Sequence, residues 1–308
     1  MCRVTAYLGD EAVVDDLLFG ADRALVRQTV DSELMSLLNL GGFGLAAWDA
    51  GSHDPARPFT YRVPTLPNFD RNLRALTRKV RARALLAHVR GVVYDERERI
   101  GPHNLHPFCF DGAHVALAQN GDLYDFGAMR YDLLEHVGPD LANRIEGTTD
   151  TEWVYALVLS GLPDPLGPAT IDDATVAVER ALTVLRGIRE RRGIRTQSPV
   201  NLVLSDGEWL LTTRFAYDYG WYPDDDSFFA GEREHDFTTL WYTTGGAFAG
   251  RDGTYAMGDG PTTSIVVASE PLTRDHTGWI EVPEYSMLRA FPDPATAELT
   301  IETRELPL

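Results

Sequence analysis

The chain opens with MCRVTAYLG (residues 1–9), in which a cysteine directly precedes a segment of alternating character. Residues 3–8 alternate well enough to predict a short strand that begins almost at the N-terminus. Because the side chain of Cys2 is small, we expect the cell to remove Met1 and leave a free α-amine on the cysteine. An α-amine has a pKa of about 7.7–8.0, so it can act as a general base toward the thiol of the same residue. Cys2 is therefore a candidate nucleophile that carries its own base; the alternative is a small apolar residue without a chemical role.

The composition is that of an ordinary globular chain with an acidic surface. Hydrophobic residues make up 44% and charged residues 24% of the 308 residues, which excludes disordered, collagen-like and coiled-coil proteins. The formal net charge of −18 disfavours nucleic acid and anionic membranes as partners. Two cysteines, the lack of a signal peptide and the lack of an apolar run of about 18 residues predict a cytoplasmic protein.

Strands are predicted at both ends of the chain and helices in its middle. The predicted strands lie within 45–49, near Tyr61, and within 82–89, 114–119, 200–214 (two strands around Asp206-Gly207), 263–269, 279–282, 285–291 and 296–303. The predicted helices run from Asn68 or Asp70 to about Val80 and over 126–137, 151–160 and 170–192. This order favours two sheets with helices outside them, in a single domain over 2–308 with a weak boundary near 163–168.

Two stretches contain no predicted helix or strand. Residues 91–106 carry charges and a Gly-Pro pair, so they are expected to form a surface loop. The stretch 222–262 is rich in glycine and aromatic residues and contains an acidic run at 224–226, which is expected to be solvated. We expect its aromatic residues, together with Trp221, to be core; the alternative is a wall that sets specificity. These residues are Trp221, Tyr222, Phe228, Phe229, Trp241 and Tyr242.

Short motifs follow Cys2 in a fixed order. They are Gly42-Phe43-Gly44, His88-Val89-Arg90, Asn104-Leu105-His106-Pro107-Phe108, Gln119-Asn120-Gly121-Asp122-Leu123, Thr149-Asp150-Thr151-Glu152, and Ser269-Glu270-Pro271-Leu272 followed by Trp279. Each motif is short, but their joint order over residues 2–279 resembles that of the class II glutamine amidotransferases. The small stand-alone members are the most similar, such as γ-glutamyl amidohydrolases of ergothioneine synthesis and glutathione-degrading amidotransferase-like subunits.

This resemblance implies the fold of the N-terminal-nucleophile hydrolases, an α+β fold built as a four-layer αββα sandwich. It also suggests site residues whose chemistry suits a γ-glutamyl substrate. Arg90 can hold the α-carboxylate with its guanidinium, and Asp150 can pair with the α-ammonium. The side-chain amide of Asn120 and the N–H of Gly121 can donate to the oxyanion of a tetrahedral intermediate.

Each of these residues also has a simpler interpretation. Arg90 could form a surface ion pair, Asp150 could cap the helix that follows it, and Asn120-Gly121 could be a plain turn. The resemblance favours the substrate-binding and oxyanion roles over these alternatives.

Other polar residues are expected to be structural. His88 shares a strand face with Arg90 and is expected to be packed, and Cys109 is expected to be a buried apolar residue. His103 and His106 lack a third ligand at a supporting spacing, so we expect no metal and no cofactor. The chain departs from the family pattern at two places. Gln119 stands where many members have a histidine or another residue. The Gly-Phe-Gly turn is usually preceded by an Asn-x-Asp-like pair, whereas Asn39-Leu40-Gly41 lacks the acidic residue.

Together these observations predict hydrolysis of a γ-glutamyl amide through a γ-glutamyl thioester on Cys2. The leaving group stays open. The substrate is glutamine or a γ-glutamyl conjugate, and the chain acts alone or as a glutaminase subunit beside a separate synthase or peptidase partner. Two further classes stay open, a non-catalytic γ-glutamyl-binding protein and an N-terminal cysteine hydrolase that cleaves acyl amides such as bile salts or penicillin V.

Overall fold

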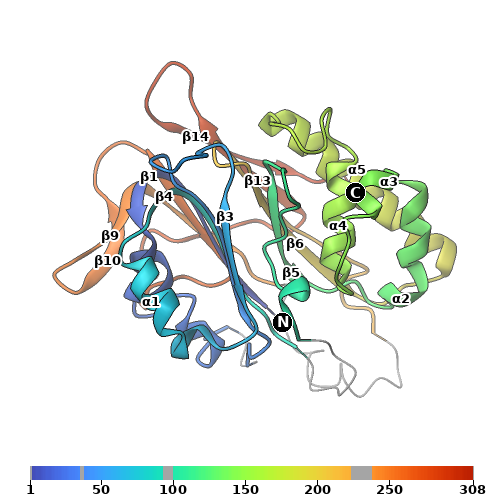
Figure 1. Cartoon of the computed structure of the whole chain (residues 1–308), viewed down its shortest axis with the longest axis horizontal. Coiled ribbons are helices and arrows are strands. Elements are labelled where there is room, and N and C mark those ends of the chain that lie inside the picture. The colour runs from blue at the N-terminus through green and yellow to red at the C-terminus, as the bar shows by residue number, and fades with distance from the viewer. Residues whose placement is uncertain (1, 35–37, 93–99, 223–237, 308) are drawn as a thin grey trace.

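Two β-sheets face each other in the computed structural model, which describes residues 2–34, 38–92, 100–222 and 238–307. Figure 1 shows helix α1 (Arg71–Thr77) outside one sheet and helices α2 to α5 outside the other. The bounds of these four helices are α2 Phe126–Met129, α3 Pro139–Ala142, α4 Asp150–Leu159 and α5 Ile171–Arg192.

The larger sheet carries the N-terminal strand near its centre. Its strands are β1 (Arg3–Val13), β2 (Phe43–Trp48), β3 (Phe59–Val63), β4 (Arg81–Val89), β9 (Trp241–Arg251), β10 (Thr254–Gly258), β11 (Ser264–Ala268) and β12 (Ile280–Glu281). Their order is β10-β9-β11-β1-β4-β2-β3, with β12 paired to β9, and the pairings are antiparallel. Strand β1 thus lies between β11 and β4.

The smaller sheet is also antiparallel. Its strands are β5 (Ala116–Gly121), β6 (Ser198–Ser205), β7 (Leu210–Arg214), β8 (Ala216–Tyr217), β13 (Ser286–Pro292) and β14 (Leu299–Glu305). Their order is β14-β13-β7-β6-β5, with β8 paired to β6. Strand β5 therefore lies at the end of this order.

The alternation along β1 explains how the layers pack. Successive side chains of a strand point to opposite faces, so Val4 and Ala6 enter the core between the sheets while Tyr7 enters the core on the outer face. Strand β5 contributes Ala116 and Ala118 to the same inter-sheet core. Small alanine side chains on β5 allow the two sheets to approach each other closely.

Helix ends follow signals that can be read in the sequence. The carboxylate of Asp70 accepts hydrogen bonds from the N–H groups of Asn72 and Leu73 and so caps α1. Thr170 and Asp173 form a reciprocal capping box at the start of α5, and Gly193, in the left-handed conformation, caps its end. Helix α5 buries Val178, Leu182 and Leu185 against the outer face of the smaller sheet, as its periodicity predicts.

Three expectations need correction. The predicted helix over 126–137 is broken into α2 and a 3-10 segment over Arg130–Glu135; Gly127, a poor helix former, lies in its first turn. The end of the predicted surface loop 91–106 is buried from Asn104 to His106, because it packs beneath β2. Trp221 is not core but 51% exposed. Residues 224–226, Phe228 and Phe229 lie outside the described residues.

Candidate active site

Cys2 lies directly before β1, whose first residue Arg3 pairs with Val89 at the end of β4. Its side chain is buried, and its Sγ atom accepts a hydrogen bond from the N–H of Gly91 at 3.3 Å. Arg90 and Gly91 directly follow β4, so antiparallel pairing brings this pair of residues beside the nucleophile candidate.

The surroundings of Cys2 act on its pKa in opposite directions. Burial raises the pKa of the thiol, and the charge of Asp150 raises it further. The N–H of Gly91 and the charge of Arg90 lower the pKa. Because burial is the largest influence on the pKa, the thiol is protonated at neutral pH.

Two glycines hold the backbone of Arg90 in place. The N–H of Arg90 donates to the carbonyl of Gly42 at 2.9 Å, and the N–H of Gly41 donates to the carbonyl of Arg90 at 2.8 Å. A Cβ atom at Gly41 would lie only 3.2 Å from Cγ of Arg90. The absence of a side chain at Gly41 therefore lets the loop before β2 lie against Arg90.

Gly44, the second glycine of the Gly-Phe-Gly turn, makes an even closer approach. A Cβ atom there would lie 2.1 Å from the backbone oxygen of His106. The Gly-Phe-Gly motif thus brings β2 against the buried segment that contains His106.

Asn120 and Gly121 are the last two residues of β5. The amide nitrogen of Asn120 lies 3.0 Å from Oγ of Ser269, and the same Oγ atom accepts the N–H of Val4 at 3.0 Å. Asn120 is therefore connected through one hydroxyl to the strand that carries Cys2. A Cβ atom at Gly121 would lie 1.9 Å from the backbone oxygen of Pro199, so this position requires glycine.

Asp150 is the first residue of α4 and is buried. Its Oδ2 atom accepts the N–H of Leu123 at 2.8 Å and Nε2 of Gln119 at 3.2 Å, and its Oδ1 atom accepts the N–H of Thr151 at 2.7 Å. Burial raises the pKa of this carboxyl, and the hydrogen bonds oppose that rise. Asp150 thus ties the loop after β5 to α4, so part of its role is structural.

Two buried histidines contact the backbone of β5. The rings of His88 and His106 lie 4.2 Å apart, and both reach the backbone of Gln119. Burial lowers the pKa of His88 to about 3 and that of His106 well below its ordinary value, so both are neutral. The prediction that His88 is packed and structural is confirmed.

The two cysteines differ in their surroundings. Sγ of Cys109 lies 3.6 Å from the carbonyl oxygen of Ala113, and the side chain is half-buried. Burial raises the pKa of this thiol to about 11. Cys109 packs against two hydrophobic clusters, as an apolar residue is expected to do, but it is half-buried rather than buried.

Two contacts at this site were not predicted. Gln119 was expected only to depart from the family pattern, whereas its amide contacts Asp150 directly. Ser269 belonged to a motif but had no predicted role, whereas it contacts Asn120. The available signal for Ser269 was its place at the end of a predicted strand, at the start of the Ser-Glu-Pro-Leu motif.

His103 and His106 do not converge. Nδ1 of His103 lies 2.8 Å from the exposed carboxylate of Glu146, whereas His106 faces Gln119. Among the described residues there is no group of three or more His, Cys, Asp or Glu side chains that could hold a metal ion. Within the same residues, no helix combines the length and the apolar character that crossing a membrane requires.

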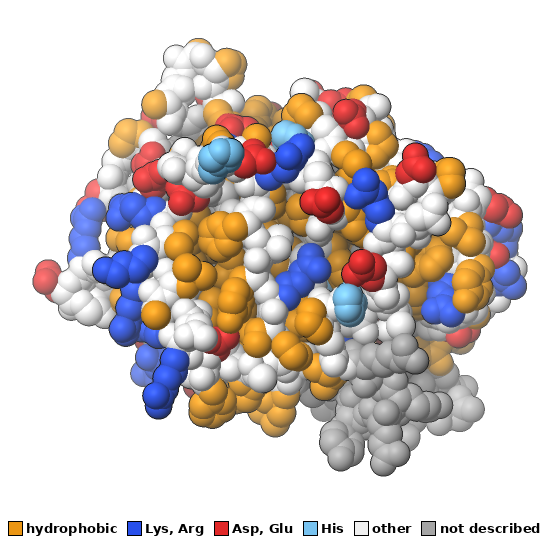
Figure 2. Space-filling view, viewed as in Figure 1, with side chains coloured by type: hydrophobic (Ala, Val, Ile, Leu, Met, Phe, Trp, Pro, Cys, Tyr) orange, Lys and Arg blue, Asp and Glu red, His pale blue; other side chains and the backbone are white. Residues whose placement is uncertain are grey.

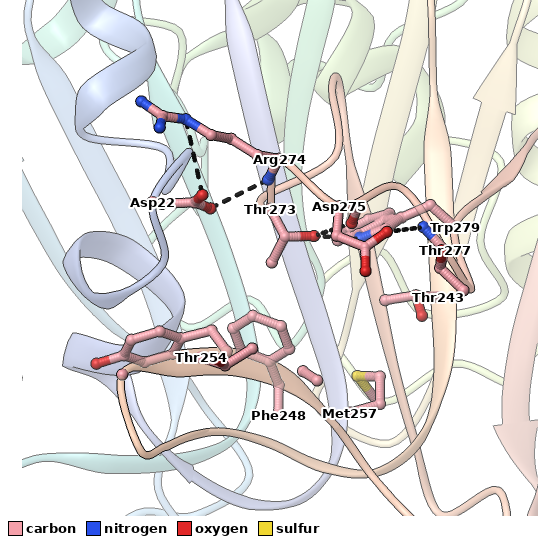
Figure 3. A pocket seen from close by; sticks show the side chains of 13 residues that line it. Asp22, Thr243, Phe248, Thr254, Met257, Thr273, Arg274, Asp275, Thr277 and Trp279 are labelled. Carbon is pink, nitrogen blue, oxygen red and sulfur yellow. Dashed lines mark hydrogen bonds and ion pairs between the residues drawn. The ribbon is translucent and has the colours of Figure 1, made fainter.

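A cavity of about 230 Å³ lies elsewhere, between the β9–β10 hairpin and the segment 273–279 (Figure 3). Phe248, Met257 and Trp279 line its apolar part, and the Asp22–Arg274 ion pair lies at its rim. None of its lining residues belongs to the candidate site. Figure 2 shows acidic, basic and apolar side chains interspersed on the face drawn, so the negative charge is not gathered in one patch there.

Comparisons with known proteins identify the family of this chain and bear on its fold. The family model described as glutamine amidotransferases class-II matches residues 39–218, which is more than half of the chain. The probable glutamine amidotransferase DUG3 of Saccharomyces cerevisiae is 26% identical over 309 residues, covering 94% of this chain and 81% of the yeast protein.

Two solved structures are similar over the whole chain. A glutamine aminotransferase class-II domain protein from Silicibacter pomeroyi has a TM-score of 0.61 at 20% identity, covering 99% of this chain and 100% of that one. The glutamine phosphoribosylpyrophosphate amidotransferase from B. subtilis has a TM-score of 0.57 at 16% identity, covering 100% of this chain and 50% of that one. At these identities the structures bear on the fold alone, and they confirm the expected α+β fold of the N-terminal-nucleophile hydrolases.

Proposed function

This chain belongs to the class II glutamine amidotransferases, a family of enzymes, and on that premise we propose that it hydrolyses a γ-glutamyl amide with Cys2 as its nucleophile. The observation that carries the proposal is the position of Cys2. Its sulfur accepts the N–H of Gly91, beside Arg90, and Asn120 is joined to the same strand by Ser269. The substrate class that fits is glutamine or a γ-glutamyl conjugate, whose γ-carbonyl would lie between the sulfur and the Asn120 amide.

The first step forms a carbon–sulfur bond. Because the buried thiol is protonated at rest, it needs a base, and the α-amine of Cys2 is the nearest one by covalent structure once Met1 is removed. The amine takes the thiol proton as the sulfur attacks the γ-carbonyl. The carbonyl electrons move onto oxygen, where Asn120 and the N–H of Gly121 hold the oxyanion.

The second step breaks the carbon–nitrogen bond. The α-ammonium of Cys2 returns its proton to the departing nitrogen, which leaves as ammonia or an amine. Water then attacks the γ-glutamyl thioester, and glutamate and the free thiol are released. The protein positions the γ-carbonyl beside Cys2 and supplies the groups that stabilise the charge on its oxygen. No external oxidant or reductant is needed.

The head group of the substrate is held by two charges. Arg90 would bind the α-carboxylate through two parallel N–H groups. Asp150 would attract the α-ammonium. To bind the ammonium directly, the Asp150 carboxylate needs an acceptor position that no other hydrogen bond uses. The hydroxyl of Thr151 lies 3.2 Å from Oδ1 of Asp150 and 3.3 Å from Oε1 of Gln119, and its single proton serves one of them. Donation to Gln119 leaves one position on Asp150 for the ammonium.

The proposal is tested by measuring the intact mass of the protein before and after 6-diazo-5-oxo-L-norleucine, a glutamine analogue that alkylates the nucleophile. We expect loss of Met1 and one adduct per chain, located on Cys2 by peptide mapping. Cys2→Ala should lose both the adduct and the release of glutamate from glutamine or γ-glutamyl peptides, assayed without a partner protein.

Cys109→Ala is the matched control, because it removes the other thiol outside the site. It should keep the adduct and the turnover. Wild-type turnover in Cys2→Ala would overturn the proposal, as would a purified protein that retains Met1 and takes up no adduct.

A further inference from the structure

We propose that Ser269 is a positioning residue that turns the Asn120 amide so that its NH₂ group faces the oxyanion. This inference rests on the proposed function, since it concerns how the oxyanion is held. It names Ser269 as the link between the strand of the nucleophile and the residue that stabilises the developing charge.

The hydroxyl of Ser269 has two neighbours at 3.0 Å. One is the N–H of Val4, which can only donate, so Oγ of Ser269 must be its acceptor. The other is the terminal amide of Asn120, which presents either nitrogen or oxygen. If nitrogen faces Ser269, the hydroxyl accepts twice. Among the described residues, its proton then has no acceptor shown and the buried Oδ1 of Asn120 has no partner.

Rotation of the Asn120 amide by 180° about χ2 gives the Ser269 proton an acceptor. The Ser269 hydroxyl then donates to Oδ1 of Asn120 while it accepts the N–H of Val4. The amide nitrogen moves to the side where the oxygen had no partner. The two ends of a carboxamide have nearly the same shape, so the surrounding hydrogen bonds decide which orientation is occupied. Among the described residues, each orientation leaves the far end of the amide without a partner, the oxygen in one case and the NH₂ group in the other. The Ser269 proton has an acceptor only in the rotated form, and a buried polar group without a partner is unfavourable, so the hydroxyl decides in favour of the rotated amide.

The rotated amide is the orientation that catalysis requires. An oxyanion is stabilised by donors, and an amide oxygen in the same place would repel it. Ser269 can dictate the orientation because the N–H of Val4 already occupies it as an acceptor, so its own proton is available to Asn120.

Ser269 is itself held firmly. It is buried, its backbone N–H donates to the carbonyl of Val4 at 3.0 Å, and its carbonyl accepts the hydroxyl of Thr239 at 2.8 Å. The next residue, Glu270, forms a buried ion pair with Arg3 at 2.8 Å. The segment after β11 is thus fastened on two successive residues to the start of β1, directly after Cys2.

A double-mutant cycle tests the assignment with glutamine as substrate. Asn120→Ala should lower kcat about 100- to 1000-fold, as loss of an oxyanion donor does elsewhere. Ser269→Ala should lower kcat at least about tenfold with KM changed less than about threefold, because the ground state makes little use of the oxyanion contact. In the Asn120→Ala background, Ser269→Ala should have no further effect on kcat.

Ser205→Ala is the matched control. Ser205 is another buried serine whose hydroxyl makes two hydrogen bonds, with Trp209 and Gly207, and it does not contact Asn120. It should lower stability to a similar extent and leave kcat unchanged. Equal losses of kcat from Ser269→Ala with and without the Asn120 side chain would overturn the assignment.

Neutron diffraction of the deuterated wild type gives a readout that does not depend on turnover. We expect the deuterium on Ser269 Oγ to point at Asn120 Oδ1. Two deuteriums on the Asn120 atom that faces Ser269 would refute the inference. A wild type that never releases glutamate would overturn the proposed function alone, while the deuterium positions would still decide the orientation of the amide.

Discussion

The backbone N–H of Gly91 points at Sγ of Cys2 from 3.3 Å, and Gly91 directly follows Arg90. A single turn of chain after β4 therefore offers both a donor and a positive charge to the nucleophile candidate. This arrangement separates two effects of Arg90 that experiments can measure independently: its influence on the thiol and its proposed contact with substrate.

Arg90→Lys should preserve the charge near Cys2 but lose the paired N–H groups. We expect kcat/KM for glutamine to fall about 10- to 150-fold, the equivalent of about 1.5–3 kcal/mol for a charge-assisted contact. Alkylation of Cys2 by the small neutral reagent iodoacetamide should stay within about twofold of the wild type.

Arg90→Gln should also slow the iodoacetamide reaction, because the charge of Arg90 lowers the pKa of Cys2 and its removal leaves less thiolate at a given pH. Alkylation rates across pH, followed by intact mass, provide the measurement. Equal kcat/KM in Arg90→Lys and wild type would argue against binding of the substrate α-carboxylate by the paired N–H groups of Arg90.

The Arg3–Glu270 pair should contribute strongly to stability. Its side chains are 1% and 3% exposed, and Arg3 also donates to the carbonyl of Cys2 at 3.0 Å. Glu270→Ala leaves a buried charge without its carboxylate, which costs about 3–5 kcal/mol. We expect a matching loss in the free energy of unfolding measured by urea denaturation.

Glu208→Ala is the control for that pair, since Glu208 is 59% exposed and forms an ion pair with Arg83 at the surface. Its effect should stay below about 1 kcal/mol. Similar losses from the two substitutions would show that burial does not set the strength of the Arg3 pair.

Asp206 should make stability depend on pH. Its carboxylate accepts the N–H groups of Glu208 and Trp209 in the turn between β6 and β7, and burial raises the pKa of Asp206 from 3.8 to about 6. The folded state binds this proton more tightly than the unfolded chain. Its stabilising effect is therefore complete below about pH 4 and is lost as the pH rises through about 6.

Asp206→Asn keeps an oxygen acceptor and removes the titration. At pH 7 the variant should be more stable than the wild type by up to about 3 kcal/mol, the equivalent of a two-unit shift. The advantage should shrink toward pH 4 in urea denaturation series. Parallel curves for the two proteins across this range would contradict the prediction.

Gly44→Ala should disturb the contact between β2 and the His106 segment. The added methyl group would meet the backbone oxygen of His106 at 2.1 Å, and backbone atoms have to move to admit it. We expect a loss of about 1–3 kcal/mol or more in the free energy of unfolding. Gly127→Ala has open space around its Cβ and lies in α2, so it should be neutral or slightly stabilising.

Local patterns were sufficient to predict most elements. The alternation at residues 3–8, the apolar run of β4 and the turn at Asp206-Gly207 each correspond to an observed strand or hairpin. Asp70 was one of two predicted caps for α1, and the structure assigns the cap to it. These signals depend on near neighbours in the chain, which is why they can be read without tertiary information.

Contacts across the fold were harder to predict. Asn120 and Ser269 are 149 residues apart, and no spacing rule brings them together. The burial of Leu105 depends on the absence of a side chain at Gly42, whose Cβ would lie 2.8 Å from a methyl group of Leu105. The exposure of Trp221 likewise depends on tertiary packing rather than on its apolar character.

The position of Cys2 and Asn120 in different sheets has a mechanical consequence. Cys2 extends a central strand of one layer, whereas Asn120 belongs to the terminal strand of the other. The distance from the Cys2 sulfur to the amide of Asn120, the proposed oxyanion donor, is therefore set by how the layers are stacked. The Ser269 hydroxyl, which contacts both layers, is therefore placed where it can keep their spacing constant beside Cys2.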